Sequence, residues 1–137
     1  MHPEYAERIL TTVQTGDPGP QAILQTAYGA LIRGDYDTFA DSLAEDAELH
    51  IAGFEPINGT WRGRKEVAEA ARGNFALLTG QQPQIDAMVK EGDSIAVLLR
   101  ESGLLKSTGQ PYRVRVVQWF TFAQGKIQTI EEIVAAV

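Results

Sequence analysis

The sequence contains no cysteine and only two histidines, His2 and His50, among its 137 residues. Without cysteine the chain can form no disulfide, use no thiolate nucleophile and bind no zinc through sulfur. Two histidines, one of them at the chain start, give little basis for a histidine metal site, and no stretch resembles a calcium-binding loop. We therefore expect neither a metal nor another cofactor.

Long apolar runs and basic clusters are also lacking. The longest apolar runs span about five residues, whereas a membrane-spanning helix needs about 20. The first ten residues, MHPEYAERIL, lack the basic and apolar segments of a signal peptide. The formal net charge of −6 disfavours binding to the nucleic-acid backbone, and the densest positive stretch, Trp61 to Lys65, is short. We expect a soluble, cytoplasmic protein with no nucleic-acid or membrane partner.

Apolar residues, at 44% of the chain, are numerous enough for one ordinary globular domain with its own core. Their spacing predicts a short helix over Pro3 to Val13, which the prolines and glycines of Thr15 to Pro20 end. A longer helix follows from Pro20, and Gly34 is placed to end it. Residues 1–19 are thus predicted to be a helix and linker, and residues 20–137 the domain.

The remaining pattern predicts two more helices and a sheet. Asp35 can cap a short helix, and a third helix is expected over about Lys65 to Leu78. Between them, residues Asp46 to Gly53 alternate with a period of two and predict a strand. Four strands joined by short glycine-containing turns follow, at residues 84–90, 94–105, 112–123 and 127–137. This order predicts an α+β fold, a curved antiparallel sheet with helices on one face.

The final strands are apolar on both faces. Val114, Val116 and Phe120 point one way, and Val117 and Trp119 point the other. A sheet face left over after the helices pack should not be this apolar in a monomer. We therefore expect a homodimer through the outer sheet face.

Three segments together resemble a known family: GDYDTFADSLAEDAELHIAG, then NGTWRGRKEVAEAARGNF, then VVQWFTFAQGKIQTIEEI. The resemblance is to SnoaL-like and ketosteroid-isomerase-like proteins of the nuclear transport factor 2-like superfamily, from about Gln21 to the C-terminus. It implies a cone-shaped sheet wrapped around a long helix, with an often apolar pocket open at one end. The family includes isomerases, polyketide cyclases, epoxide hydrolases, dehydratases and non-enzymatic modules, so fold alone assigns no function.

Position by position, the resemblance argues against steroid isomerisation. The carboxylate base of a ketosteroid isomerase falls on Ile51, its protonated Asp on Gln118, and its tyrosine close to Tyr28. With isoleucine in place of the base, proton abstraction by that route has lost its main group.

The epoxide hydrolases of the superfamily match in part. Their arginine corresponds to Arg100, and their two aspartates fall on Ser102 and Glu132. Arg100 lies beside Glu101 in the strand VLLRESGLL, so one of the two must face inward. From the family positions we expect Arg100 to face inward and meet Glu132, with Gln118 near both, and Glu101 to face outward. A lone buried charge is costly, so the pair is structural or also contacts a ligand, unless both side chains are solvated near the rim of the pocket.

Three further residues are candidates for the pocket. His50 lies beside the missing base and titrates near neutral pH, although alternation turns it away if Leu49 and Ile51 face the core. Trp61 precedes the third helix, where family members often carry an aromatic lid, and is either lid or core. Tyr28 lies on the core side of its helix, and its hydroxyl could reach a pocket.

The leading hypothesis is an enzyme of lyase, isomerase or hydrolase type. Its small-molecule substrate would be largely apolar and carry a carbonyl, enol or epoxide oxygen. The alternative is a non-catalytic small-molecule-binding or dimerisation module of the same fold. The candidate catalytic residues are Arg100, Glu132 and His50, and the candidate ligand-binding residues are Tyr28, Trp61 and Gln118.

Overall fold

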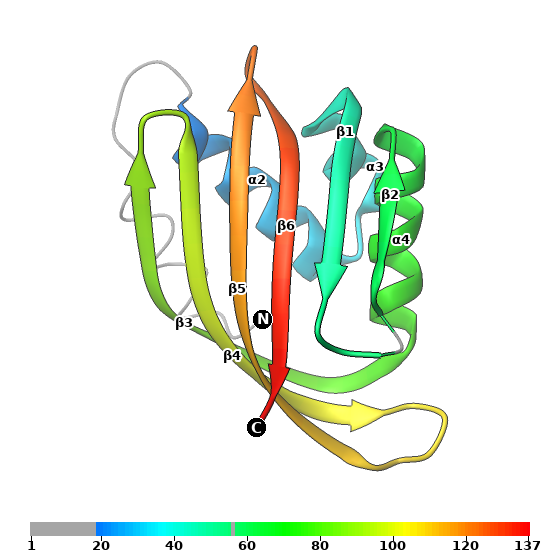
Figure 1. Cartoon of the computed structure of the whole chain (residues 1–137). Coiled ribbons are helices and arrows are strands. Elements are labelled where there is room, and N and C mark those ends of the chain that lie inside the picture. The colour runs from blue at the N-terminus through cyan, green and yellow to red at the C-terminus, as the bar shows by residue number, and fades with distance from the viewer. Residues whose placement is uncertain (1–18, 56) are drawn as a thin grey trace.

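The computed structural model describes residues 19–55 and 57–137, which form three helices on one face of a six-stranded sheet (Figure 1). The helices are α2 (Pro20–Arg33), α3 (Tyr36–Asp41) and α4 (Arg64–Ala76). The strands are β1 (Leu43–Ala52), β2 (Gly59–Arg62), β3 (Leu78–Glu91), β4 (Ser94–Leu105), β5 (Pro111–Ala123) and β6 (Lys126–Ala136). The helix expected over Pro3 to Val13 lies outside the described residues.

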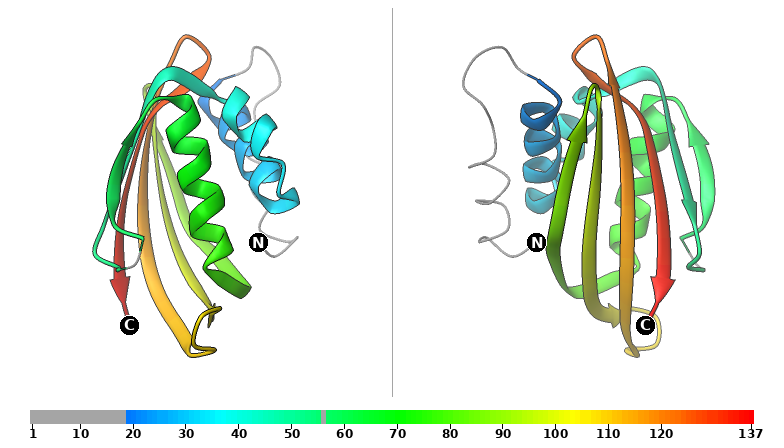
Figure 2. Two further views of the ribbon diagram at one scale, coloured as in Figure 1. Left: turned by 90° about the vertical axis from the view of Figure 1, so that its right-hand side faces the viewer. Right: turned by 60° about the vertical axis from the view of Figure 1, so that its left-hand side comes forward.

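The sheet has the order β2-β1-β6-β5-β4-β3 and does not close, so β2 and β3 are its edges. It curves around the helices, and Figure 2 shows them gathered on one side. We call the helix side the concave face and the opposite side the convex face. The α+β architecture and the curved sheet expected from the sequence are confirmed.

Two features of the sheet differ from the expected antiparallel hairpins. β1 pairs with β6 in parallel, with Leu49 opposite Ile130. This pairing joins segments about 80 residues apart, so no local turn sequence predicts it. The other difference is β2, which was not among the expected strands and which pairs antiparallel with β1, with Trp61 opposite Leu49. Four residues are too few to display a period of two.

The first two helices begin and end where their local sequence directs. Pro20 occupies the first turn of α2, and Gly34 ends it in a left-handed conformation at φ 70°. The side chain of Asp35 then accepts a hydrogen bond from the backbone N–H of Thr38 and caps α3. These caps fix α2 across the concave face, with Tyr28 on its buried side.

The third helix, α4, ends earlier than expected, at Ala76, and Leu78 already begins β3. Val67 is fully buried, whereas Phe75 and Leu78 are only partly buried. Both line a cavity, and Leu78 also packs against the core. The end of α4 therefore contributes to the cavity wall.

No helix in residues 19–55 and 57–137 combines the length and apolarity needed to cross a membrane. The same residues contain no group of three or more His, Asp or Glu side chains placed to hold a metal ion.

Candidate functional site

A cavity of about 480 Å³ lies between the helices and the concave face of the sheet. Its volume is in the range of small-molecule sites in proteins. Most of its wall is aliphatic or aromatic, with contributions from Leu24 on α2, Leu99 on β4 and Phe120 on β5. Its polar side chains include Tyr28, Glu101, Tyr112, Gln118 and Glu132. An apolar wall with a few polar groups is typical of sites that orient a small molecule.

Tyr28, Gln118 and Glu132 form a hydrogen-bonded chain across the cavity wall. Gln118 on β5 and Glu132 on β6 are direct cross-strand partners, and Gln118 Nε2 donates to Glu132 Oε1 at 2.8 Å. The Tyr28 hydroxyl, from α2, donates to Gln118 Oε1. The Tyr28 ring also meets Phe120 edge to face, with 6.1 Å between ring centroids. A helix and two strands thus hold the three polar groups in one arrangement.

The directions of these hydrogen bonds determine which donor and acceptor atoms remain available to a ligand. Gln118 uses its carbonyl oxygen for Tyr28 and one N–H for Glu132, which leaves its second N–H. Glu132 accepts through Oε1, which leaves Oε2. Both remaining groups belong to side chains in the cavity wall. A ligand atom can therefore meet one amide donor and one carboxyl oxygen at the same place.

Burial raises the pKa of the Glu132 carboxyl above its usual value of 4.5, although the hydrogen bond from Gln118 acts in the opposite direction, and the charge of Glu101 adds to the rise. Burial, with a smaller contribution from Glu132, likewise raises the pKa of the Tyr28 hydroxyl. Tyr28 therefore stays protonated as a donor. Glu132 takes up a proton more readily than an ordinary glutamate, as an acid–base catalyst requires.

A second polar pair lies on the neighbouring part of the wall. The Tyr112 hydroxyl donates to Glu101 Oε2 at 2.7 Å. Tyr112 lies opposite Gly103 in the sheet, and a Cβ on that glycine would come within 2.8 Å of the tyrosine ring and hydroxyl. Phe54 packs against Tyr112, with 6.1 Å between ring centroids. The glycine and the phenylalanine thus hold the tyrosine in place beside Glu101.

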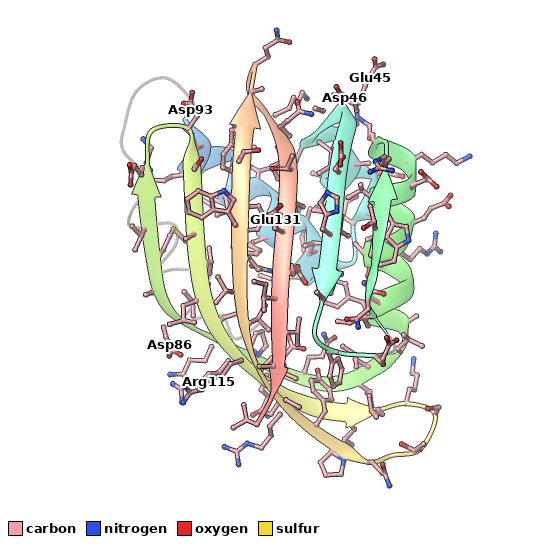
Figure 3. The ribbon with its side chains drawn as sticks, in the orientation of Figure 1. Glu45, Asp46, Asp86, Asp93, Arg115 and Glu131 are labelled. Atoms are coloured by element: carbon pink, nitrogen blue, oxygen red, sulfur yellow. The ribbon has the colours of Figure 1, made fainter. Side chains whose placement is uncertain are left out.

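The expected contact between Arg100 and Glu132 is wrong. Arg100 lies on the convex face, where Nε and Nη2 each donate to a carboxylate oxygen of Asp86 at 2.8 Å. The cause is the alternation of β4: Leu99 is buried on the concave face, so Arg100 points outward and Glu101 points inward. Figure 3 looks onto the convex face and shows Asp86 there, beside Arg115.

Two other candidates are also absent from the described cavity wall. His50 lies on β1 with its ring nitrogens 3.0 Å from Glu48 Oε1 and 3.2 Å from Thr60 Oγ1. Trp61 packs against the core, with its ring over Gly59. Of the six candidates, the structure brings Tyr28, Gln118 and Glu132 together.

Sequence reasoning missed the inward position of Glu101 and the partner it finds in Tyr112. One signal was available: Ile95, Val97 and Leu99 are more apolar than the alternate set, and Glu101 continues their side of the strand.

Comparison with known proteins places this geometry in a family. The SnoaL-like domain model matches residues 24–130. An NTF2-like protein from Burkholderia thailandensis E264 is 26% identical, with a TM-score of 0.75, over 85% of this chain and 90% of that one. An NTF2-like protein from Burkholderia xenovorans LB400 is 24% identical, with a TM-score of 0.73, over 84% and 88%.

A more distant structure is described as a SnoaL-like polyketide cyclase from Jannaschia sp. CCS1. It is 16% identical, with a TM-score of 0.71, over 89% of this chain and 91% of that one. No curated protein matches the chain. The domain match over most of the chain and the shared cone fold agree with each other. The chain belongs to the SnoaL-like domain family of the NTF2-like superfamily.

Proposed function

We propose that the protein is a small-molecule enzyme of lyase, isomerase or hydrolase type that uses Glu132 for proton transfer. The observation that carries the proposal is a carboxyl of raised pKa in the wall of an apolar cavity, hydrogen-bonded to Gln118. A structural relative described as a polyketide cyclase has the same fold. The substrate would be largely apolar, to match the wall, and would carry a carbonyl, enol or epoxide oxygen.

In this proposal the protonated Glu132 and the second N–H of Gln118 both donate to the substrate oxygen. Negative charge that develops on that oxygen is stabilised by the two donors, and it ends as a hydroxyl when Glu132 gives up its proton. For an epoxide, water attacks a ring carbon as its C–O bond breaks, the ring oxygen takes the Glu132 proton, and the Glu132 carboxylate then accepts the proton that the added water loses. Tyr28 contributes by fixing the orientation of the Gln118 amide.

The test is turnover of a panel of epoxides, enones and aromatic polyketide-like compounds by the pure protein. We expect Glu132→Gln to lower turnover by about a hundredfold or more, the usual contribution of a positioned acid–base group. Glu91→Gln is the matched control, because Glu91 is exposed at the end of β3 and should leave turnover unchanged. Turnover that survives Glu132→Gln would refute the assignment.

One observation favours the alternative, a non-catalytic binding module. Ile51 lines the cavity at the position where the resemblance implies the isomerase base. If the wild-type protein binds members of the panel and turns over none of them, the binding module is the better assignment.

We also propose that two chains associate through the convex face. An apolar row of Leu98, Val117 and Ile133 crosses β4, β5 and β6 in register, and Ile133 is 64% exposed. Glu131 lies on one side of this row and Arg115 on the other, as the two labels in Figure 3 indicate. A twofold axis through the row would bury it and bring Arg115 of each chain toward Glu131 of the other.

A further inference from the structure

The cavity wall is acidic as well as apolar. Two carboxyl side chains line it, Glu101 from β4 and Glu132 from β6. Among the described residues of the lining, the one lysine or arginine is Arg33, whose side chain is 61% exposed and lies 3.9 Å from Asp35. Even with Glu132 protonated, the charge of Glu101 repels an anionic ligand group and attracts a cation.

The two carboxyl groups are set apart along the sheet. Glu132 pairs with Gln118 of β5, and Glu101 pairs with Val114 of the same strand. Gln118 and Val114 are four residues apart, which corresponds to about 13 Å along a strand. The two backbone positions therefore differ, and the carboxyls occupy neighbouring parts of one cavity wall, close enough for the charge of Glu101 to act on Glu132.

The Glu101 end is held in place by surrounding groups. Tyr112 donates its hydroxyl to Oε2 of Glu101, which leaves Oε1 for another partner. Phe54 lines the same cavity next to Tyr112. The carboxylate attracts a cationic group, and Tyr112 and Phe54 supply aromatic surface in the same cavity wall, which tolerates such a group.

We propose that the ligand of this cavity carries a protonated amine or quaternary ammonium group that meets Glu101, while its oxygen function lies at Gln118 and Glu132. The second half of this statement rests on the proposed function. The first half rests on the Glu101 end alone and does not require turnover.

The test uses three probes of nearly equal size and different charge: naphthylethylammonium, naphthylacetamide and naphthylacetate. Binding to the full chain is measured by calorimetry at neutral pH and low salt. We expect the ammonium probe to bind about tenfold more tightly than the amide, and the acetate to bind most weakly.

Glu101→Gln should lower the affinity for the ammonium probe to that for the amide. Glutamine can still accept the hydrogen bond from Tyr112, so this variant removes the charge and keeps the contact. Glu91→Gln removes an equal charge from an exposed position and should preserve the preference. Thermal melting checks that both variants are folded.

The proposal is overturned if the ammonium probe fails to bind at about 1 mM, if it binds no better than the amide, or if the preference survives Glu101→Gln. These outcomes are independent of turnover. Preference for the cation without turnover that depends on Glu132 would leave this inference standing and refute the proposed function. The reverse result would refute this inference and leave the function in place.

Discussion

The two faces of the sheet formed by β4, β5 and β6 use polar residues in opposite ways. On the concave face, Gln118 and Glu132 are surrounded by apolar side chains and are tied to each other and to Tyr28 by hydrogen bonds. On the convex face, Arg100 and Asp86 form an ion pair in which the arginine is half exposed. The same strands thus carry a fixed polar arrangement inside and solvated charges outside.

The difference follows from how many hydrogen-bond partners water supplies on each face of the sheet. A polar group in the cavity wall has few water partners, so the protein must provide them, and the partners then fix its orientation. An exposed charge is already solvated, and its ion pair adds little. The proposed chemistry therefore lies on the concave face, and the proposed association of chains uses the convex face, where the apolar row is exposed.

The largest expected change in stability comes from comparing two single variants that place an aspartate at adjacent residues of β4. Val97 is fully buried on the concave face, and Leu98 is 43% exposed on the convex face. Val97→Asp buries an unpaired carboxylate and should lower the free energy of unfolding by about 4 kcal/mol or more. Leu98→Asp should leave the chain folded and favour the monomer. Urea unfolding and gel filtration distinguish the two results; similar unfolding of both variants would contradict the assignment of faces.

A smaller effect is expected on the dissociation constant of the proposed dimer. Arg115→Glu places two acidic side chains opposite each other in the proposed dimer, twice by symmetry. We expect the dimer dissociation constant to rise about a hundredfold, which corresponds to about 2.7 kcal/mol. Adding Glu131→Arg in the same chain should restore association, and sedimentation equilibrium measures both steps. A double variant that stays as weak as the single one would rule out this packing.

The fold could be predicted from the sequence because its signals are local. Pro20, Gly34 and Asp35 mark the ends of the first two helices by their own backbone chemistry. The glycine-containing turns mark the hairpins of β3 to β6. The parallel pairing of β1 with β6 carries no such local mark, and it was missed.

The site was harder to predict because strand alternation has two solutions that differ by one residue. Leu98 and Leu99 are equally apolar, so the deciding signal in β4 lay further back, in Ile95 and Val97, whose side of the strand continues to Glu101. The match of Arg100 to the arginine of the epoxide hydrolases predicted the wrong face of β4 to point inward. A shift of one residue exchanges the two faces of a strand. The link from Tyr28 to Gln118 depends on how a helix packs on the sheet, which no local pattern specifies.

A further effect is expected from the pH dependence of stability. Because the pKa of Glu132 is raised in the folded state, that state binds the proton more tightly than the unfolded chain does. Its contribution is fully present below the unfolded value, about 4.5, and is lost as the pH rises through the raised pKa. Glu132→Gln removes this loss, so the variant should gain stability relative to wild type as the pH rises from 4 to 8. Urea unfolding across that range measures it, and a constant difference would contradict the raised pKa.

The smallest expected energy is the coupling between Arg100 and Asp86. Arg100 forms this ion pair on the convex face in place of the predicted contact with Glu132. Arg100 donates two hydrogen bonds to Asp86, but the arginine side chain is 51% exposed, so solvent and salt screen the attraction. A double-mutant cycle with Arg100→Ala and Asp86→Ala should give a coupling energy of at most about 1 kcal/mol, falling as salt is added. Neither change should alter the binding of a cavity ligand, because both residues lie on the convex face. A coupling energy well above this value, or a loss of ligand affinity in either variant, would mean that the two faces are not independent.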